Sequence, residues 1–188
     1  MRRNLLLTFF VLGLISIAVY VLVKQVPPPS SEQTQARGQG AIPSAPKTGH
    51  WSDIALTTLA GHSVKLADFK GKVILVNYWA TWCPPCLAEI PDLIQAQNDF
   101  GPKGFQVVGI DYQDRADLET LKRFVKRKRI NYPIIRDTPK KTHTISKAMG
   151  GVFALPMSLL IDRDGKIIKT HTGQLHYKDL EGWLKKQL

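Results

Sequence analysis

Cys83 and Cys86 are the only two cysteines of the chain, and they stand between an apolar run and a helix-forming segment. The run over residues 73–80 carries apolar side chains at both alternating positions, which is typical of a central strand buried on both faces. A helix is expected over residues 84–100, because Pro84 suits a first helical position, where its missing N–H costs nothing. A buried strand that leads through Cys-x-x-Cys into a helix is the arrangement of a redox-active dithiol.

The remaining elements follow from turn signals and hydrophobic periodicity. Hairpins are expected where turn residues separate short apolar runs, over residues 54–66 and 157–169. Further strands are expected over 105–110 and 133–135, and further helices over 114–129, 142–149 and the C-terminal stripe of Leu180, Trp183, Leu184 and Leu188. Strands that alternate with helices, followed by a hairpin and a closing helix, predict a mixed α/β sheet.

The first 25 residues predict a transmembrane anchor. An uncharged run over residues 5–23 follows Arg2 and Arg3, and its length is enough to span a bilayer as a helix. The positive-inside rule keeps the arginines in the cytoplasm and places the rest of the chain on the far side of the membrane. The alternative is a cleaved signal peptide. No small-residue cleavage site follows the run, so a retained anchor is favoured.

Composition separates the anchor from a folded domain. Residues 26–48 are rich in Pro, Ser, Gly and Gln, cannot bury enough apolar surface to order themselves, and predict a flexible linker before a domain at 49–188. The net charge of +11 would suit acidic partners, anionic membranes or nucleic acid. No nucleic-acid-binding signature accompanies the charge, so nucleic acid is not expected as a partner. The basic cluster at 122–129 is expected to face water at a helix end, with a docking patch as the alternative.

The chemistry expected of the dithiol is thiol–disulfide exchange. The thiolate is the reactive form of cysteine, and a helix N-terminus stabilises it. Cys83, at the start of the helix, is expected to be the exposed nucleophile, and Cys86, one turn further in, the buried resolving thiol. Cys83 would attack a target disulfide, and Cys86 would then attack Cys83 and release the reduced target. Glu89 is the candidate base for that second step, and a solvated first-turn carboxylate is the alternative for this residue.

The segment 73–91, with Asn77-Tyr-Trp-Ala-Thr-Trp-Cys-Pro-Pro-Cys86 and Glu89-Ile-Pro91, resembles the membrane-anchored thioredoxin-like family of the TlpA, ResA and CcmG/DsbE type. The resemblance extends over about residues 50–188 and includes the later Leu155-Pro156. It implies a thioredoxin fold, with a mixed central β-sheet flanked by helices and an extra strand–helix unit between the first helix and the Pro156 loop. It also implies a protein disulfide reductase without a bound cofactor. Such a protein is tethered to the inner (cytoplasmic) membrane, with its redox domain in the periplasm.

The resemblance assigns a role to several side chains. Cys83 corresponds to the attacking cysteine and Cys86 to the resolving one, while Glu89 matches the buried acid below the dithiol. Pro156 matches the cis-proline that faces the disulfide, and Trp82 the aromatic residue beside it.

Three positions depart from the pattern that the resemblance implies. Asn77 stands where plain thioredoxins have a buried aspartate, which favours Glu89 as the base. Leu155 replaces the threonine often found before the cis-proline, and Met157 replaces the small polar residue common after it. Both changes are expected to line the substrate groove and to alter the choice of substrate.

Partners and rival functions complete the expectations. The resemblance implies disulfide-containing protein substrates, apocytochrome c among them, and a transmembrane electron donor of the DsbD or CcdA type. One rival is a disulfide-donating oxidase or isomerase, and another is an inert structural disulfide. A third is a non-enzymatic copper-handling protein, which usually needs Cys-x-x-x-Cys and a suitably placed histidine. No metal site is expected, since zinc takes four ligands and the chain has no second cysteine pair.

Overall fold

The computed structural model describes residues 52–136 and 142–188, all of which belong to one compact unit, Pro43–Leu188. The predicted anchor at 1–25, the predicted linker at 26–48 and the first residues of the predicted domain lie outside the described residues. Among the helices of the described part, none is long and apolar enough to cross a membrane.

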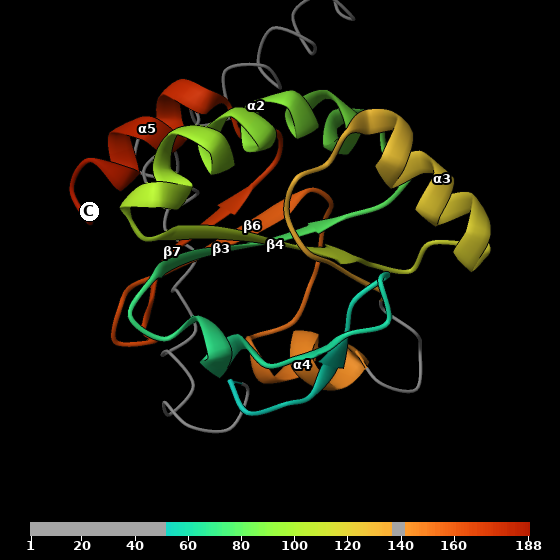
Figure 1. Cartoon of the computed structure of the whole chain (residues 1–188), viewed down its shortest axis with the longest axis horizontal. Helices are drawn as coiled ribbons and strands as arrows, with labels where there is room; N and C mark the ends of the chain where they lie inside the picture. Colours follow the sequence, from blue (N-terminus) through green and yellow to red (C-terminus); the bar gives the residue numbers. More distant parts are fainter. Residues whose placement is uncertain (1–51, 137–141) are drawn as a thin grey trace, which may run out of the picture. The chain divides into compact units, whose positions relative to one another are not determined.

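A five-stranded mixed sheet forms the centre of the unit (Figure 1). Its strand order is β5-β4-β3-β6-β7. The strands are β3 (Val73–Trp79), β4 (Phe105–Asp111), β5 (Ile134–Arg136), β6 (Met157–Ile161) and β7 (Ile167–Thr172). β3 pairs in parallel with β4 and antiparallel with β6. The predicted central strand is therefore confirmed, with the sheet extending on both sides of it.

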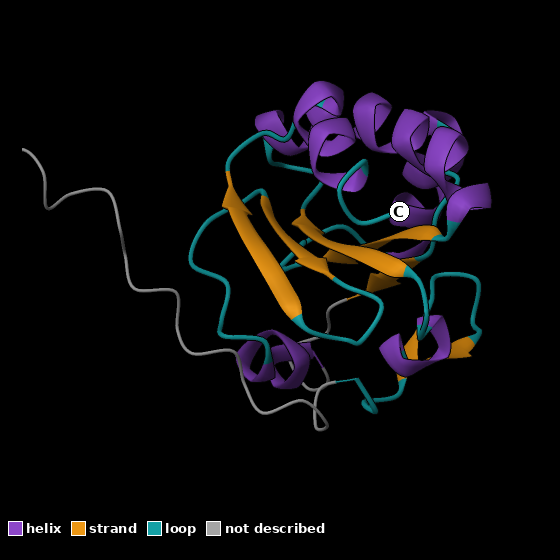
Figure 2. Cartoon of the chain, turned by 90° about the vertical axis from the view of Figure 1, so that its left-hand side faces the viewer, coloured by secondary structure: helices purple, strands orange, loops and turns teal. Residues whose placement is uncertain are grey.

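Helices cover both faces of the sheet, as Figures 1 and 2 show. On one face lie α2 (Pro84–Phe100), the short 3₁₀ turn η3 (Gly101–Lys103), α3 (Leu118–Lys128) and α5 (Tyr177–Leu184). On the other face lie α4 (Thr142–Ala148), the 3₁₀ turn η2 (Leu66–Phe69) and a small hairpin of β1 (Leu56–Thr57) and β2 (Ser63–Val64). The layers are thus helix, sheet, helix.

The alternation of side chains along β3 divides the core between these layers. All seven residues of β3 are buried. Leu75 and Trp79 belong to the apolar cluster under α2, α3 and α5, whereas Val76 and Tyr78 belong to the cluster on the α4 side. This is the period-two pattern of a strand covered on both faces.

Most of the predicted elements are confirmed, α2 with the predicted bounds. Two strand–helix units, β4–α3 and β5–α4, lie between α2 and Pro156, which fits the expected extra unit. The helix predicted over 114–129 begins only at Leu118, because Asp117 caps it: the Thr120 N–H donates to Asp117 Oδ1 at 2.7 Å. The last helix ends at Leu184, so Leu188 lies beyond it and is exposed.

Candidate functional site

Strand direction brings three distant segments to one edge of the sheet. Because β3 and β4 are parallel, their carboxyl ends lie side by side. Because β6 is antiparallel to β3, its first residues lie beside the same end, where Met157 pairs with Tyr78. The turn that carries Cys83, the loop after Asp111 and the loop before β6 therefore meet at this edge.

A disulfide joins Cys83 and Cys86 at the start of α2. Cys83 is the N-cap, with an extended backbone, and Pro84 takes the first helical position, as predicted. The N–H of Leu87 donates to the Cys83 carbonyl at 3.1 Å and begins the helix. The expectation that Cys83 is exposed is wrong: this residue is 3 % exposed, and Cys86 is fully buried.

The surroundings still distinguish the two cysteines. Cys83 borders a surface hollow of about 410 Å³, and Cys86 does not. The hollow is walled by the Cys83 turn, the loop after β4 and the loop before β6, through Trp82, Cys83, Pro84, Pro85, Tyr112, Gln113, Val152, Phe153, Ala154 and Leu155. Trp82 is 57 % exposed and Phe153 is 74 % exposed. The hollow beside Cys83 is thus completed by a loop about 70 residues further along the chain, which the sequence around Cys83 could not indicate.

Of the residues expected to form the groove, Trp82 and Leu155 line the hollow. The Leu155–Pro156 peptide bond is cis, as the resemblance implied, and Pro156 itself is buried. Met157 was expected in the groove, and that expectation is wrong. As the first residue of β6 it is 2 % exposed and points into the core cluster on the α4 side.

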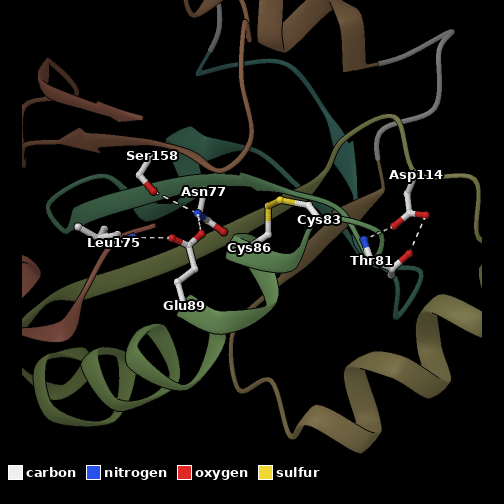
Figure 3. Close-up of a disulfide and its surroundings, with 8 residues drawn as sticks. All are labelled: Asn77, Thr81, Cys83, Cys86, Glu89, Asp114, Ser158 and Leu175. Carbon is white, nitrogen blue, oxygen red and sulfur yellow. Dashed lines mark hydrogen bonds between the residues drawn. A yellow bond between two sulfur atoms is a disulfide. The ribbon is translucent and has the colours of Figure 1, made fainter. Parts of the chain in front are cut away.

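Beneath Cys86, a buried polar network surrounds Glu89 (Figure 3). The Asn77 amide donates to Glu89 Oε1 at 2.8 Å and to Ser158 Oγ at 3.1 Å. The backbone N–H of Leu175 donates to Glu89 Oε2 at 2.8 Å. Glu89 is fully buried, which excludes the solvated alternative. Each carboxyl oxygen therefore accepts a hydrogen bond from a different segment of the fold.

Burial dominates the ionisation of Glu89. It raises the pKa of Glu89 to about 7, although the hydrogen bonds from Leu175 and Asn77 oppose the rise. A carboxyl group that titrates near neutral pH, one helical turn from Cys86, can accept and return a proton during exchange. Burial, followed by the charge of Glu89, also raises the pKa of Tyr132, so this phenol stays neutral.

Comparison with known proteins shows the family of the chain. The Redoxin family model matches residues 40–184. The chain belongs to the Redoxin family. The thiol-disulfide oxidoreductase ResA of Bacillus thuringiensis subsp. konkukian is 37 % identical over 134 residues, which cover 71 % of this chain and 74 % of that protein. ResA of Halalkalibacterium halodurans is 30 % identical over 71 % of this chain and 72 % of its own length.

Solved structures of thiol-disulfide exchange proteins also match the chain. A thioredoxin-family thiol:disulfide interchange protein from Chlorobium tepidum has a TM-score of 0.63 and 32 % identity, over 71 % of this chain and 91 % of that one. A DsbF homologue from Corynebacterium diphtheriae has a TM-score of 0.62 and 31 % identity, over 72 % and 84 % of the two chains. This Redoxin chain is therefore a thiol-disulfide oxidoreductase with a thioredoxin-like α/β fold, as the sequence predicted.

The Redoxin site also contains residues that the sequence interpretation missed. Asp114 was expected only as the first residue of the helix over 114–129, yet its carboxylate binds Thr81, two residues before Cys83. Ser158 and Leu175 were not considered at all, and they complete the network around Glu89. No local motif marks these residues, because each contacts a residue that is distant in the sequence. Within the described ranges, no three His, Cys, Asp or Glu residues form a group that could hold a metal ion.

Proposed function

We propose that this chain reduces protein disulfides through Cys83 and Cys86, on the periplasmic side of an inner membrane to which residues 1–25 tether it. The asymmetry of the disulfide supports the roles assigned to the two cysteines. Cys83 borders the open hollow, whereas Cys86 is buried one turn from an acid whose pKa is about 7. A target can meet Cys83, and Cys86 has a proton acceptor at hand.

Exchange then takes two steps. The Cys83 thiolate attacks a target sulfur, a Cys83–target S–S bond forms, and the target's own disulfide breaks to release one thiolate. Cys86 then passes its proton to Glu89 and attacks Cys83. The Cys83–Cys86 bond forms, the Cys83–target bond breaks, and the second target thiolate leaves. Two electrons pass from the dithiol to the target, and the oxidised state with the Cys83–Cys86 disulfide remains.

The compartment and partners follow from the uncharged run at 5–23 and from the family resemblance. A reductase in an oxidising compartment needs a source of electrons, and a transmembrane donor of the DsbD or CcdA type would supply them. Apocytochrome c is the substrate that we favour, because its haem-binding thiols must be reduced before haem attaches. Trp82 and Phe153, which are exposed and line the hollow, offer apolar contact area to the segment around a target cysteine.

The experiment that tests this function is the reduction potential of the full chain, equilibrated with glutathione buffers in detergent micelles. A potential near or below about −220 mV would place the dithiol among thioredoxin-like reductants and support the proposal. A potential near about −120 mV would make the chain a disulfide donor and overturn it.

A second experiment tests the compartment. Cells that produce the full chain are first treated with a reductant and then with a membrane-impermeant maleimide. A cytoplasmic thiol protein serves as the control for entry of the maleimide into the cytoplasm. Labelling of Cys83 in cells with a permeable outer envelope supports the periplasmic placement. Labelling that appears only after the inner membrane is broken would contradict it.

A further inference from the structure

A carboxylate that the proposed exchange does not use joins two loops beside the disulfide. Asp114 Oδ2 accepts the backbone N–H of Thr81 at 2.5 Å, and Oδ1 accepts the Thr81 hydroxyl at 2.9 Å (Figure 3). Asp114 Oδ1 also accepts the N–H of Ala116 at 2.9 Å. Donors from Thr81 and Ala116 therefore hold this side chain, and through it the loop after β3 is bound to the loop after β4.

The contact acts on the turn that presents the nucleophile. Thr81 is two residues before Cys83, and the N–H of Cys83 donates to the Ala80 carbonyl at 3.2 Å. One residue before that turn, the Trp79 carbonyl accepts the N–H of Tyr112 at 2.8 Å. The segment from β3 to Cys83 is therefore held by the loop after β4 at two successive points.

The same loop forms one wall of the hollow. Tyr112 and Gln113 both line it, together with the loop that carries Phe153 and Leu155. Gln113 has a φ of 53°, a left-handed conformation that non-glycine residues seldom adopt. Such a conformation persists only where neighbouring contacts hold it, and the bonds of Asp114, the next residue, provide such contacts.

We propose that Asp114 is a positioning residue for the dithiol: by anchoring Thr81, it holds the Cys83 sulfur within reach of Cys86. This inference rests on the proposed function, because it concerns the resolving step, in which the Cys83–target bond breaks and the Cys83–Cys86 bond forms. Fixing one reacting group beside another raises their effective concentration. A turn released from Asp114 samples more conformations, and closure of the disulfide becomes less favourable.

The test is the equilibrium of the full chain with glutathione, which reports how strongly the two thiols favour their disulfide. Asp114→Asn keeps the size of the side chain but places an amide donor against the donors of Thr81. We expect its equilibrium constant for disulfide formation to fall about tenfold, which corresponds to a potential higher by about 30 mV. Thr81→Val removes only the hydroxyl and should lower the constant about threefold. Thr81→Ser should restore it to within about twofold of wild type, since the hydroxyl returns.

Asp117 offers a matched control. Its carboxylate accepts the N–H and the hydroxyl of Thr120 at 2.7 and 3.0 Å, the same pair of bonds, at a helix N-cap that does not border the hollow. Asp117→Asn should leave the equilibrium constant within about twofold of wild type. If the equilibrium constant falls equally in Asp114→Asn and Asp117→Asn, the effect is a general loss of stability and the inference is overturned. An equilibrium constant of Asp114→Asn equal to that of wild type would also overturn it.

Circular dichroism shows whether each variant folds. If Asp114→Asn does not fold, Thr81→Val carries the test, and a constant equal to that of Thr81→Ser would overturn the inference. The potential of the wild-type chain tests the proposed function, whereas the ratio of variant to wild type tests Asp114. A wild-type chain that donates disulfides would therefore leave the test of Asp114 intact.

Discussion

The two ends of the disulfide lie in opposite surroundings. Cys83 borders a hollow that two exposed aromatic side chains, Trp82 and Phe153, also line. Cys86 is fully buried one turn from Glu89, whose two carboxyl oxygens both accept hydrogen bonds. In the proposed exchange, the start of a single helix thus separates a surface that binds the target from an interior that accepts a proton. Two chemically identical thiols would then differ in role because of what packs around them.

The largest effect should come from exchanging the two cysteines for serine, one at a time. Cys83→Ser removes the group that meets the target, so reductase activity should fall roughly a thousandfold or more. Cys86→Ser leaves the attack intact but blocks resolution, so mixed disulfides with targets should accumulate on a non-reducing gel. Adducts in Cys83→Ser and none in Cys86→Ser would reverse the assigned roles.

Glu89→Gln tests the buried side of the comparison. A group that acts as general base contributes about a hundredfold or more, so resolution of a mixed disulfide should slow by about that factor. Stopped-flow mixing of reduced protein with a target disulfide measures this step. The rate in wild type should rise through pH 7 as Glu89 ionises, because its pKa is about 7. An identical pH profile in Glu89→Gln would remove Glu89 from the mechanism.

The same carboxyl should make the stability of the chain depend on pH. Burial is the main cause that raises its pKa from 4.5 to about 7 in the folded chain. Between these values the folded chain keeps a proton that the unfolded chain has lost, so stability is full below about pH 4.5 and falls as pH rises to about 7. The loss by pH 8 should be on the order of 3 kcal/mol. Urea unfolding from pH 4.5 to 8 measures it, and Glu89→Gln should flatten the curve.

Substitutions at the hollow beside Cys83 should weaken binding of the target rather than lower the stability of the chain. Trp82→Ala and Phe153→Ala each remove an exposed aromatic side chain at the hollow, so KM for a protein disulfide should rise about tenfold. Ile168→Ala is the matched control, because Ile168 is exposed on β7 and does not line the hollow. Oxidised glutathione, which is too small to use this surface, should be reduced at unchanged KM. An equal rise for both substrates would contradict a docking role.

The smallest effect is expected at Ser158. Removal of its hydroxyl leaves one N–H of Asn77 without an acceptor in a buried site, so Ser158→Ala should cost about 1 kcal/mol of unfolding free energy. Ser146 is the control, because its hydroxyl is buried without a hydrogen-bond partner among the described residues. Ser146→Ala should therefore cost nothing. Urea unfolding at pH 5 makes the comparison while Glu89 is protonated in the folded chain.

The sequence could predict the elements that depend on local signals. Pro84 at the start and Gly101 after the end of α2 mark its bounds, and apolar side chains at nearly every position identify β3. The identity of the dithiol needed only the spacing of Cys83 and Cys86. These features lie within about 30 residues of one another.

The parts that could not be predicted depend on register and on loop placement. Asn77 and Ser158 are direct partners in the pairing of β3 with β6, and 81 residues separate them. Leu175 reaches Glu89 across 86 residues. The hollow beside Cys83 likewise depends on the distant loop before β6. Periodicity gives the face that a side chain occupies on its own element, but not the segment that will lie against it.

The local nature of the disulfide has a consequence for oxidative folding. The chain has two cysteines, so it has one possible intramolecular disulfide and no wrong pairing to correct. Since only three positions separate them, an unfolded chain can close this bond before any tertiary contact forms. The acid that would activate Cys86 gains its partners only once β3, β6 and the segment before α5 have assembled. A newly synthesised chain can thus oxidise early, while the environment proposed to control the exchange appears only with the complete fold.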